Sequence, residues 1–265
     1  MKKLLMYSLF ICFLFNCSSR DEEIVEEAHI LPLKTTLRST TTDYVLSSFF
    51  TYKNNNEIIN ITTLDNNNVT IHKEVFTYDK DNISKIEFYE YNNLVKTSEF
   101  FYDNSVVIKN IITYNDGHKN HFLYNWLSNN HLVLKKKETE SYEDFNYYFS
   151  NGNLTKYIYK YNSNMYNNFG ETTYNYEYNK SPNVYSNIKG YDKIFIFETF
   201  SSKDNIKTIA GLISQTTNGN TSNKTSQDDY SYEYYSSGYP KKQTEISTNQ
   251  EGEITSYVRE YQYNK

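Results

Sequence analysis

The sequence predicts an all-β protein: a long antiparallel meander forming a strongly curved sheet or an open barrel. Three observations carry this prediction. Short segments end in Tyr followed by Asp or Asn, usually with another aromatic residue shortly before the Tyr. These tyrosines recur every 10 to 13 residues. Tyr alternates with other residues in several later segments. The chain also contains 29 Tyr but only 8 Gly and 3 Pro. The alternation is the period of a half-buried strand.

The first residues read as a bacterial secretion signal. Lys2 and Lys3 precede an apolar stretch, residues 4–15, that only Ser8 interrupts. This stretch is too short to span a bilayer as a helix, which takes about 20 residues. Residues 1–16 are therefore predicted to be a lipoprotein signal peptide, removed to leave Cys17 as the lipid-bearing first residue. Phe15 and Asn16 depart from the small residues that usually precede such a cysteine. A plain signal peptide, or an anchor that is never cut, is the alternative.

Residues 17–42 are expected to form an acidic, Thr-rich tether. Asp21, Glu22, Glu23, Glu26 and Glu27 follow Cys17 closely, and such a run of like charge is normally solvated. Ser-Ser-Arg-Asp-Glu-Glu, directly after the cysteine, resembles the export signal of Bacteroidota-type outer-membrane lipoproteins. The resemblance implies display on the outer surface of the cell.

A repeated strand-and-turn unit occupies residues 43–265, which we interpret as a single β domain. Its tyrosines in the first half are Tyr78, Tyr91, Tyr102, Tyr114 and Tyr124. Related units begin at residues 147, 174 and 230. A step of this length holds one strand and one tight turn, and it is too short for a helical-hairpin or propeller-blade repeat. Asn tolerates positive φ, so Asn is expected to take the place of Gly in the turns.

Three later segments place tyrosines on one face of a strand. The pattern implies one covered and one solvated face of the sheet. Tyrosines that faced outward would suit stacking on sugars, and the single Trp could be core or platform. The speculative ligand-binding residues are Tyr157, Tyr159, Tyr161, Tyr174, Tyr176, Tyr178, Tyr230, Tyr232, Tyr234 and Trp126.

The repeat breaks at residues 181–213. Pro182 and Gly190 interrupt it, and Ile206, Ile209 and Ile213 recur at a weak helical spacing. We expect a short helix or loop here that plugs the concave side of the sheet, with one more hairpin as the alternative. Residues 215–229 are polar and predict a long hairpin loop.

Charge and cysteine content exclude several function classes. The formal net charge of −5 argues against nucleic acid as a partner, because phosphate binding needs clustered Lys and Arg. It also argues against docking on anionic lipids, so the acyl chains at Cys17 must anchor the protein. The other cysteine, Cys12, lies in the signal core. The mature chain therefore has no pair of cysteines for a disulfide or a thiolate metal site.

Residues 232–242, together with Ser181-Pro-Asn and Ser202-Lys-Asp-Asn-Ile-Lys, carry a family resemblance. They resemble surface lipoproteins of the Bacteroidota type that have a porin-like β domain. The repeats also resemble the Tyr-Asp repeats of the Rhs class, which contain more Gly. This resemblance implies a β-meander and an envelope setting, and it supplies no catalytic residues.

No residue cluster predicts a reaction, a metal site or a cofactor. His118 and His121, with Asp116 nearby, lack further ligands at a fixed spacing. The acidic pairs Asp228–Asp229 and Asp79/Asp81 lack the ligand ladder of a calcium loop. Glu177 and Glu233 occupy matching positions between tyrosines, which strand alternation explains without catalysis.

We therefore expect a non-enzymatic outer-membrane lipoprotein, held by its N-terminal lipid, that binds or scaffolds, with carbohydrate as the favoured ligand. An envelope accessory protein that acts through protein partners, such as an outer-membrane transporter, is the alternative. A glycoside hydrolase is a third hypothesis, and it would need two carboxylates converging in a cleft.

Overall fold

The computed structural model describes residues 29–54, 56–136, 142–163, 168–194 and 202–265. These residues form one antiparallel sheet that closes into a barrel, because its first strand pairs with its last. Every other strand pairs with its neighbours in the chain, as a meander requires. The prediction of an all-β meander is confirmed, and the curved sheet is a fully closed barrel.

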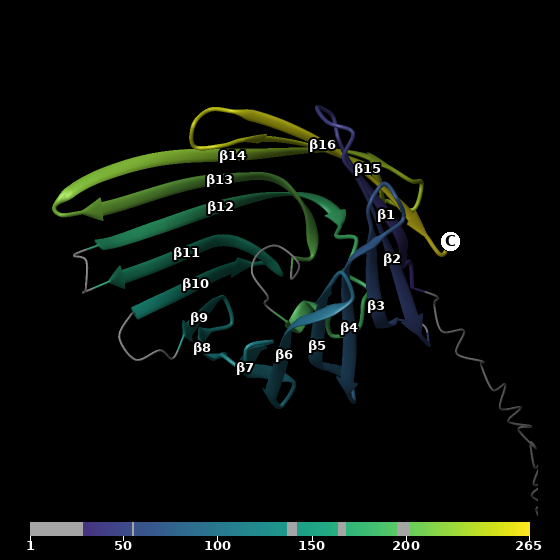
Figure 1. The fold of residues 1–265 in the computed structure, drawn as a ribbon, viewed down its shortest axis with the longest axis horizontal. Coiled ribbons are helices and arrows are strands. Elements are labelled where there is room, and N and C mark those ends of the chain that lie inside the picture. Colours follow the sequence, from purple (N-terminus) through teal and green to yellow (C-terminus); the bar gives the residue numbers. More distant parts are fainter. Residues whose placement is uncertain (1–28, 55, 137–141, 164–167, 195–201) are drawn as a thin grey trace, which may run out of the picture.

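The described residues contain sixteen strands, shown in Figure 1 with β1–β5 at the right and the long strands β12–β14 reaching to the left. The first eight are β1 (Pro32–Ser39), β2 (Val45–Lys53), β3 (Glu57–Leu64), β4 (Thr70–Asp79), β5 (Asn82–Glu90), β6 (Asn93–Asp103), β7 (Val106–Tyr114) and β8 (Lys119–Ser128). The others are β9 (His131–Lys136), β10 (Tyr142–Ser150), β11 (Asn153–Ser163), β12 (Asn168–Pro182), β13 (Asp204–Thr217), β14 (Asn220–Tyr234), β15 (Pro240–Thr248) and β16 (Ile254–Tyr263).

Asn replaces Gly in the turns, as the sequence predicts. Most non-glycine residues with positive φ are asparagines at strand ends: Asn54, Asn68, Asn92, Asn104, Asn151 and Asn218. Asn tolerates this left-handed conformation better than other residues with a Cβ. Tight hairpins can therefore form although the chain has only 8 Gly.

Tyrosine hydroxyls satisfy carbonyl groups at irregular points of the sheet. Tyr102 of β6 donates to the Ile83 carbonyl of β5 at 2.7 Å, beside the bulge where β4 and β5 shift register. A bulge leaves a backbone group without its ladder partner, and the hydroxyl supplies one. Four other tyrosine hydroxyls donate in the same way to a carbonyl of the preceding strand, at a point where the pairing of that strand shifts register. These bonds are Tyr52 to Pro32, Tyr178 to Leu154, Tyr232 to Ile206 and Tyr263 to Pro240.

The inside of the barrel holds the hydrophobic core. Ile58 and Ile83 have no exposed surface, and aromatic rings from most strands pack around them. Because side chains alternate across each strand, the remaining positions point outward. A barrel of this many strands encloses more space than its wall side chains alone fill, so the interior also takes up a segment of the chain.

The outward face of the barrel is mixed: exposed apolar side chains such as Ile108, Leu123 and Phe169 stand among charged ones. Lysines and glutamates face each other across neighbouring strands, and two outward rings, Phe49 and Phe101, lie under Lys34 and Lys109 at 5.1 Å. The outward ion pairs include Lys85–Glu87, Lys160–Glu171, Lys207–Glu177 and Lys242–Glu233, with N–O distances of 2.9 to 3.3 Å. This confirms one covered and one solvated face of the sheet.

The interruption of the repeat is a plug, but a shorter one than predicted. Residues 183–194 leave the sheet after β12 and contain one short 3-10 helix, η2 (Tyr191–Lys193). The predicted helical spacing at Ile206, Ile209 and Ile213 is wrong, because these residues lie in β13. Residues 195–201 lie outside the described ranges. Among the described residues, no helix has the length and apolar character needed to cross a membrane.

Two further boundaries differ from the prediction. Residues 215–229 are the end of β13 and most of β14, joined by a tight turn at 218–219, and do not form a long loop. Their polar side chains fit a strand because this hairpin is largely solvent-exposed. At the N-terminus, β1 lies within the predicted tether, so the barrel begins at Pro32. Cys17 lies outside the described residues.

Candidate functional site: a cavity inside the barrel

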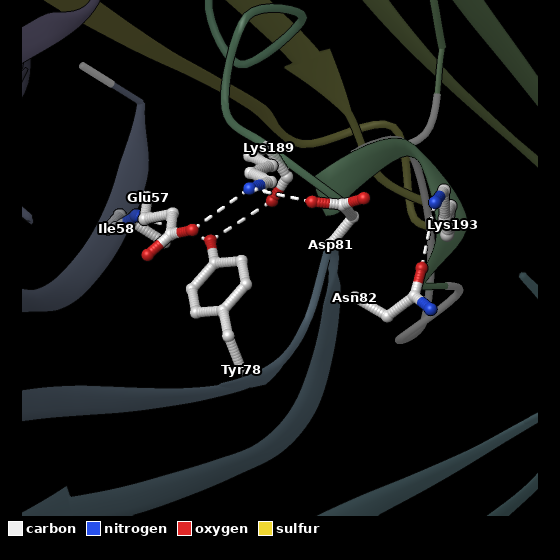
Figure 2. A network of polar contacts seen from close by, with 7 residues as sticks. All are labelled: Glu57, Ile58, Tyr78, Asp81, Asn82, Lys189 and Lys193. Atoms are coloured by element: carbon white, nitrogen blue, oxygen red, sulfur yellow. Dashed lines mark hydrogen bonds and ion pairs between the residues drawn. The ribbon is translucent and has the colours of Figure 1, made fainter. Parts of the chain in front are cut away.

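Residues 183–194, which we call the plug, are fastened to one rim of the barrel (Figure 2). Lys189 Nζ lies 2.9 Å from Glu57 Oε1 and 2.8 Å from Asp81 Oδ1, at the β2–β3 and β4–β5 turns. The Tyr78 hydroxyl donates to the Lys189 carbonyl at 3.0 Å, and Lys193 Nζ donates to Asn82 Oδ1 at 2.7 Å. The plug is thus held where these hairpins turn.

The plug carries aromatic and aliphatic side chains into the barrel, Ile188 among them. Tyr191 packs against Phe76 with ring centroids 6.2 Å apart, and Tyr185 packs against Tyr191 at 5.6 Å. Gly190 allows this approach, because its φ is +71° and an added Cβ would lie 3.0 Å from the Asp81 carbonyl oxygen. Ile194 is buried beside them. The aromatic end of the plug therefore forms the inner wall of a cavity.

One cavity, of about 360 Å³, lies between the plug and strands β1–β5 and opens on one side. Its walls are mainly aliphatic and aromatic, with the Ser48–Thr63 hydroxyl pair at 2.9 Å among them. Such an apolar pocket with a few convergent polar groups is the usual form of a small-molecule site. The residues that line this cavity include Leu46, Ser48, Phe50, Ile61, Ile86, Phe88, His72, Glu74, Tyr185, Tyr191 and Arg259.

A smaller cavity, of about 180 Å³, lies on the other side of Arg259 and Tyr185, which line both. Its wall is a chain of hydrogen bonds across β13–β16. The Tyr261 hydroxyl donates to Gln243 Oε1 at 2.6 Å, and Gln243 Nε2 donates to the Tyr232 hydroxyl at 3.3 Å. This chain holds the tyrosine rings in fixed positions.

Arg259, on β16, is the charged group shared by the two cavities. It donates a hydrogen bond to Tyr185, and none of the ion pairs in the described part of the chain includes it. Burial lowers the pKa of Arg259, but the surrounding Tyr261, Tyr185 and Glu245 outweigh this and raise the pKa. The guanidinium is therefore a fixed positive charge inside the barrel.

Two other ionisable groups face this region. Burial raises the pKa of Glu245, partly offset by the nearby Arg259. On the far wall, a hydrogen bond to Glu74 raises the pKa of His72 above its ordinary value, with burial acting in the opposite sense. The His72 Nε2–Glu74 Oε1 distance is 3.2 Å, so this carboxylate already has a partner.

The tyrosines predicted as ligand contacts lie on the inner face of the sheet. Tyr157 and Tyr176 are each 6% exposed, and Tyr159, Tyr174, Tyr178 and Tyr230 pack against the core. Tyr161 stacks on Tyr159 at 5.8 Å, and Tyr232 on Tyr234 at 5.8 Å; Tyr234 is the most exposed at 38%. Of the nine, Tyr230 and Tyr232 line the smaller cavity, and Tyr174 and Tyr176 line a third cavity of about 400 Å³. A ligand would meet the buried rings only from inside the barrel.

Trp126 and the residues considered for chemistry do not gather at the cavity. Trp126 packs against the core with its ring 5.8 Å from that of Phe149. His118 bonds Asn120 beside a turn, and Glu177 and Glu233 point outward to lysines. Within the described residues, no three His, Cys, Asp or Glu side chains gather as a metal site would require.

Sequence reasoning missed Arg259 and the plug tyrosines. Arg259 is one of three arginines and the only one in the second half of the chain. That rarity on an inward position of a strand was the available signal. Tyr185 and Tyr191 lie outside the repeat, where the prediction gave a plug without naming the side chains that it inserts.

The comparisons support the fold. A porin-like protein from Bacteroides vulgatus matches with a TM-score of 0.55 and 10% identity, over 89% of this chain and 99% of that one. A porin-like protein from Bacteroides uniformis matches with a TM-score of 0.50 and 9% identity, over 88% and 96%. No protein-family model and no curated protein matches the chain. At these identities the likeness defines a shared barrel fold.

Proposed function

We propose that this protein is a lipid-tethered binding protein of the outer membrane, not an enzyme, whose barrel stands in water and holds a small molecule in the internal cavity. The single observation that carries this proposal is the arrangement of the barrel: lysine–glutamate pairs on the outside, an apolar core inside, and a cavity of about 360 Å³ against the plug. The predicted lipid on Cys17 supplies the attachment to the membrane.

The outward face argues for a barrel surrounded by water. A barrel that spans a membrane carries an apolar band about 25 Å tall on its outside, and one Lys or Arg at the bilayer midplane costs about 2–4 kcal/mol. Here lysine–glutamate pairs stand on the outward positions of β5, β11, β12, β14 and β15. The cost falls toward the membrane interfaces, so the mid-strand pair Lys85–Glu87 of β5 weighs most against a spanning barrel. The acyl chains, not the strands, are therefore proposed to enter the bilayer.

The plug supports a binding cavity with a closed floor over an open channel through the barrel. It is fastened at the rim that carries the β2–β3 and β4–β5 turns. The cavity lies above it, toward the opposite ends of β1–β5, where Leu37 and Leu46 line its wall. A molecule entering from that side would meet Tyr185 and Tyr191 as a floor.

Ser48→Phe is expected to weaken binding of a neutral apolar probe, N-phenylnaphthylamine, about tenfold or more. The new ring would replace the hydroxyl bonded to Thr63 and project into the cavity, and loss of about 1.4 kcal/mol of contact between the probe and the walls corresponds to tenfold in affinity. The measurement is a fluorescence titration of the probe.

Ser47→Phe is the matched control, because Ser47 pairs with Leu64 and Thr36 on the outward face of the same strand. It should bind the probe as the unchanged chain does. Equal weakening by both variants, or no binding to the unchanged chain, would contradict the proposed site.

A further inference from the structure

We propose that the cavity selects small amphipathic anions, and that Arg259 receives the carboxylate or a similar acidic group while the apolar walls take up a body of about two rings. This inference rests on the proposed binding function and deepens it. It assigns the chemical class of the ligand and the residue that recognises its acidic group.

The buried charge of Arg259 favours a ligand with an acidic group. A buried guanidinium costs free energy unless it is paired, and its planar fork is suited to two parallel hydrogen bonds with an acidic group. Arg259 has the Tyr185 hydroxyl as one partner and no carboxylate at ion-pair distance in the described residues. Glu74, the carboxylate that lines the same cavity, is held by His72 at 3.2 Å. Glu245 lines the smaller cavity with Arg259 and interacts with the guanidinium electrostatically, but it is not within ion-pair distance among the described residues. An incoming anion would complete the pairing of Arg259.

Arg259 lies at one end of the cavity wall, which sets how a ligand would lie. In the barrel, β16 is followed by β1, β2, β3, β4 and β5, and these strands form one arc around the cavity. Arg259 lies on the first strand of this arc, and Ile86 and Phe88 lie on the last. A ligand held at Arg259 by its acidic end would therefore place its apolar body against Phe50, Ile61 and Ile86.

The cavity volume sets the size of the ligand. An apolar cavity of about 150 Å³ in another protein takes up one benzene. The space of about 360 Å³ here therefore suits roughly two rings or an aliphatic body of equal size. The hydroxyls of Ser48 and Thr63 bond each other, which reduces the polarity that the apolar body meets there.

The test compares naphthoate with naphthalenemethanol, which differ in the acidic group, as competitors of N-phenylnaphthylamine on the full chain. Naphthoate is expected to displace the probe at least tenfold better. Arg259→Gln should lower naphthoate affinity roughly tenfold to a hundredfold relative to the affinity for the alcohol, the effect of a hydrogen bond to a charged group. Arg38→Gln, on the outward face of β1, is the matched control and should change nothing.

Arg259→Lys keeps the charge without the fork and should lose part of the naphthoate preference. If Arg259→Gln damages the barrel and no longer binds the probe, the naphthoate preference of Arg259→Lys is the test of the inference. Equal displacement by the acid and the alcohol on the unchanged chain would overturn the inference while leaving the binding function in place. Failure of the probe itself to bind would overturn the binding function.

Discussion

Raising the pH above about 10 is expected to unfold the barrel steeply, with the loss complete within one to two pH units. Tyrosines inside the barrel keep their protons in the folded state. Burial raises the pKa of Tyr78 and Tyr178 to about 12, and burial raises the pKa of Tyr124 and Tyr261 still further. With 29 Tyr in the chain, the effect of many such groups adds up.

The sign follows from proton binding. In the unfolded chain a tyrosine has a pKa of about 10, so above this pH the folded state binds more protons than the unfolded state. The stabilisation is fully present below pH 10 and is lost as the pH rises toward the raised values. Each buried tyrosine, such as Tyr124, lowers the free energy of unfolding by about 1.4 kcal/mol per pH unit. A few of them exhaust the roughly 5–15 kcal/mol of a typical domain.

The measurement is phenolate absorbance and far-ultraviolet circular dichroism against pH. Most of the absorbance change should coincide with the loss of strand signal. The same chain in denaturant is the control and should titrate near pH 10. Reversible ionisation of nearly all tyrosines near pH 10 with the strand signal intact would contradict buried inner rings.

Gly190→Ala is expected to lower the free energy of unfolding by about 3 kcal/mol. A residue with a Cβ at φ +71° is strained by about 1–2 kcal/mol. The added Cβ would also stand 3.0 Å from the Asp81 carbonyl oxygen and 3.3 Å from the Ile83 amide nitrogen. Backbone atoms cannot rotate aside as a side chain can, so the plug would have to lift from the rim.

Gly117→Ala separates the two causes. Gly117 has a φ of +85°, and an added Cβ there would meet nothing within 4 Å. Only the conformational strain remains, and the expected loss is about 1 kcal/mol. Both variants are measured by denaturant unfolding. Equal losses in the two would show that the plug is not seated against the β4–β5 turn.

Much of the fold was predictable because strand and turn signals are local. The alternation at Tyr157–Tyr161 indicates the inner face, and Asn after the aromatic pair indicates a left-handed turn. The choice of Tyr over Phe has a second cause that only the structure shows. Hydroxyls such as that of Tyr102 satisfy carbonyls at bulges on the neighbouring strand. That cause depends on register, which a single sequence does not contain.

The site was less predictable because its parts lie far apart in the chain. Ser48, Tyr185 and Arg259 meet only because β1 closes on β16 and the plug turns inward. The spacing of Ile206, Ile209 and Ile213 misled for a related reason: their neighbours in β13 decide strand over helix. The glycan hypothesis relied on tyrosines facing outward, and the structure turns most of these rings toward the core.

The barrel is proposed to stand in water and not to span the membrane. The most direct measurement takes the full chain with Cys17→Ser, which cannot receive the lipid, and asks for detergent-free solubility and for conductance in a planar bilayer. The unchanged chain, predicted to be lipidated, should partition into detergent and serves as the control. We expect the variant to stay in solution as a monodisperse, strand-rich protein that opens no channel. A variant that needs detergent, or that produces stepwise conductance, would contradict a water-facing barrel.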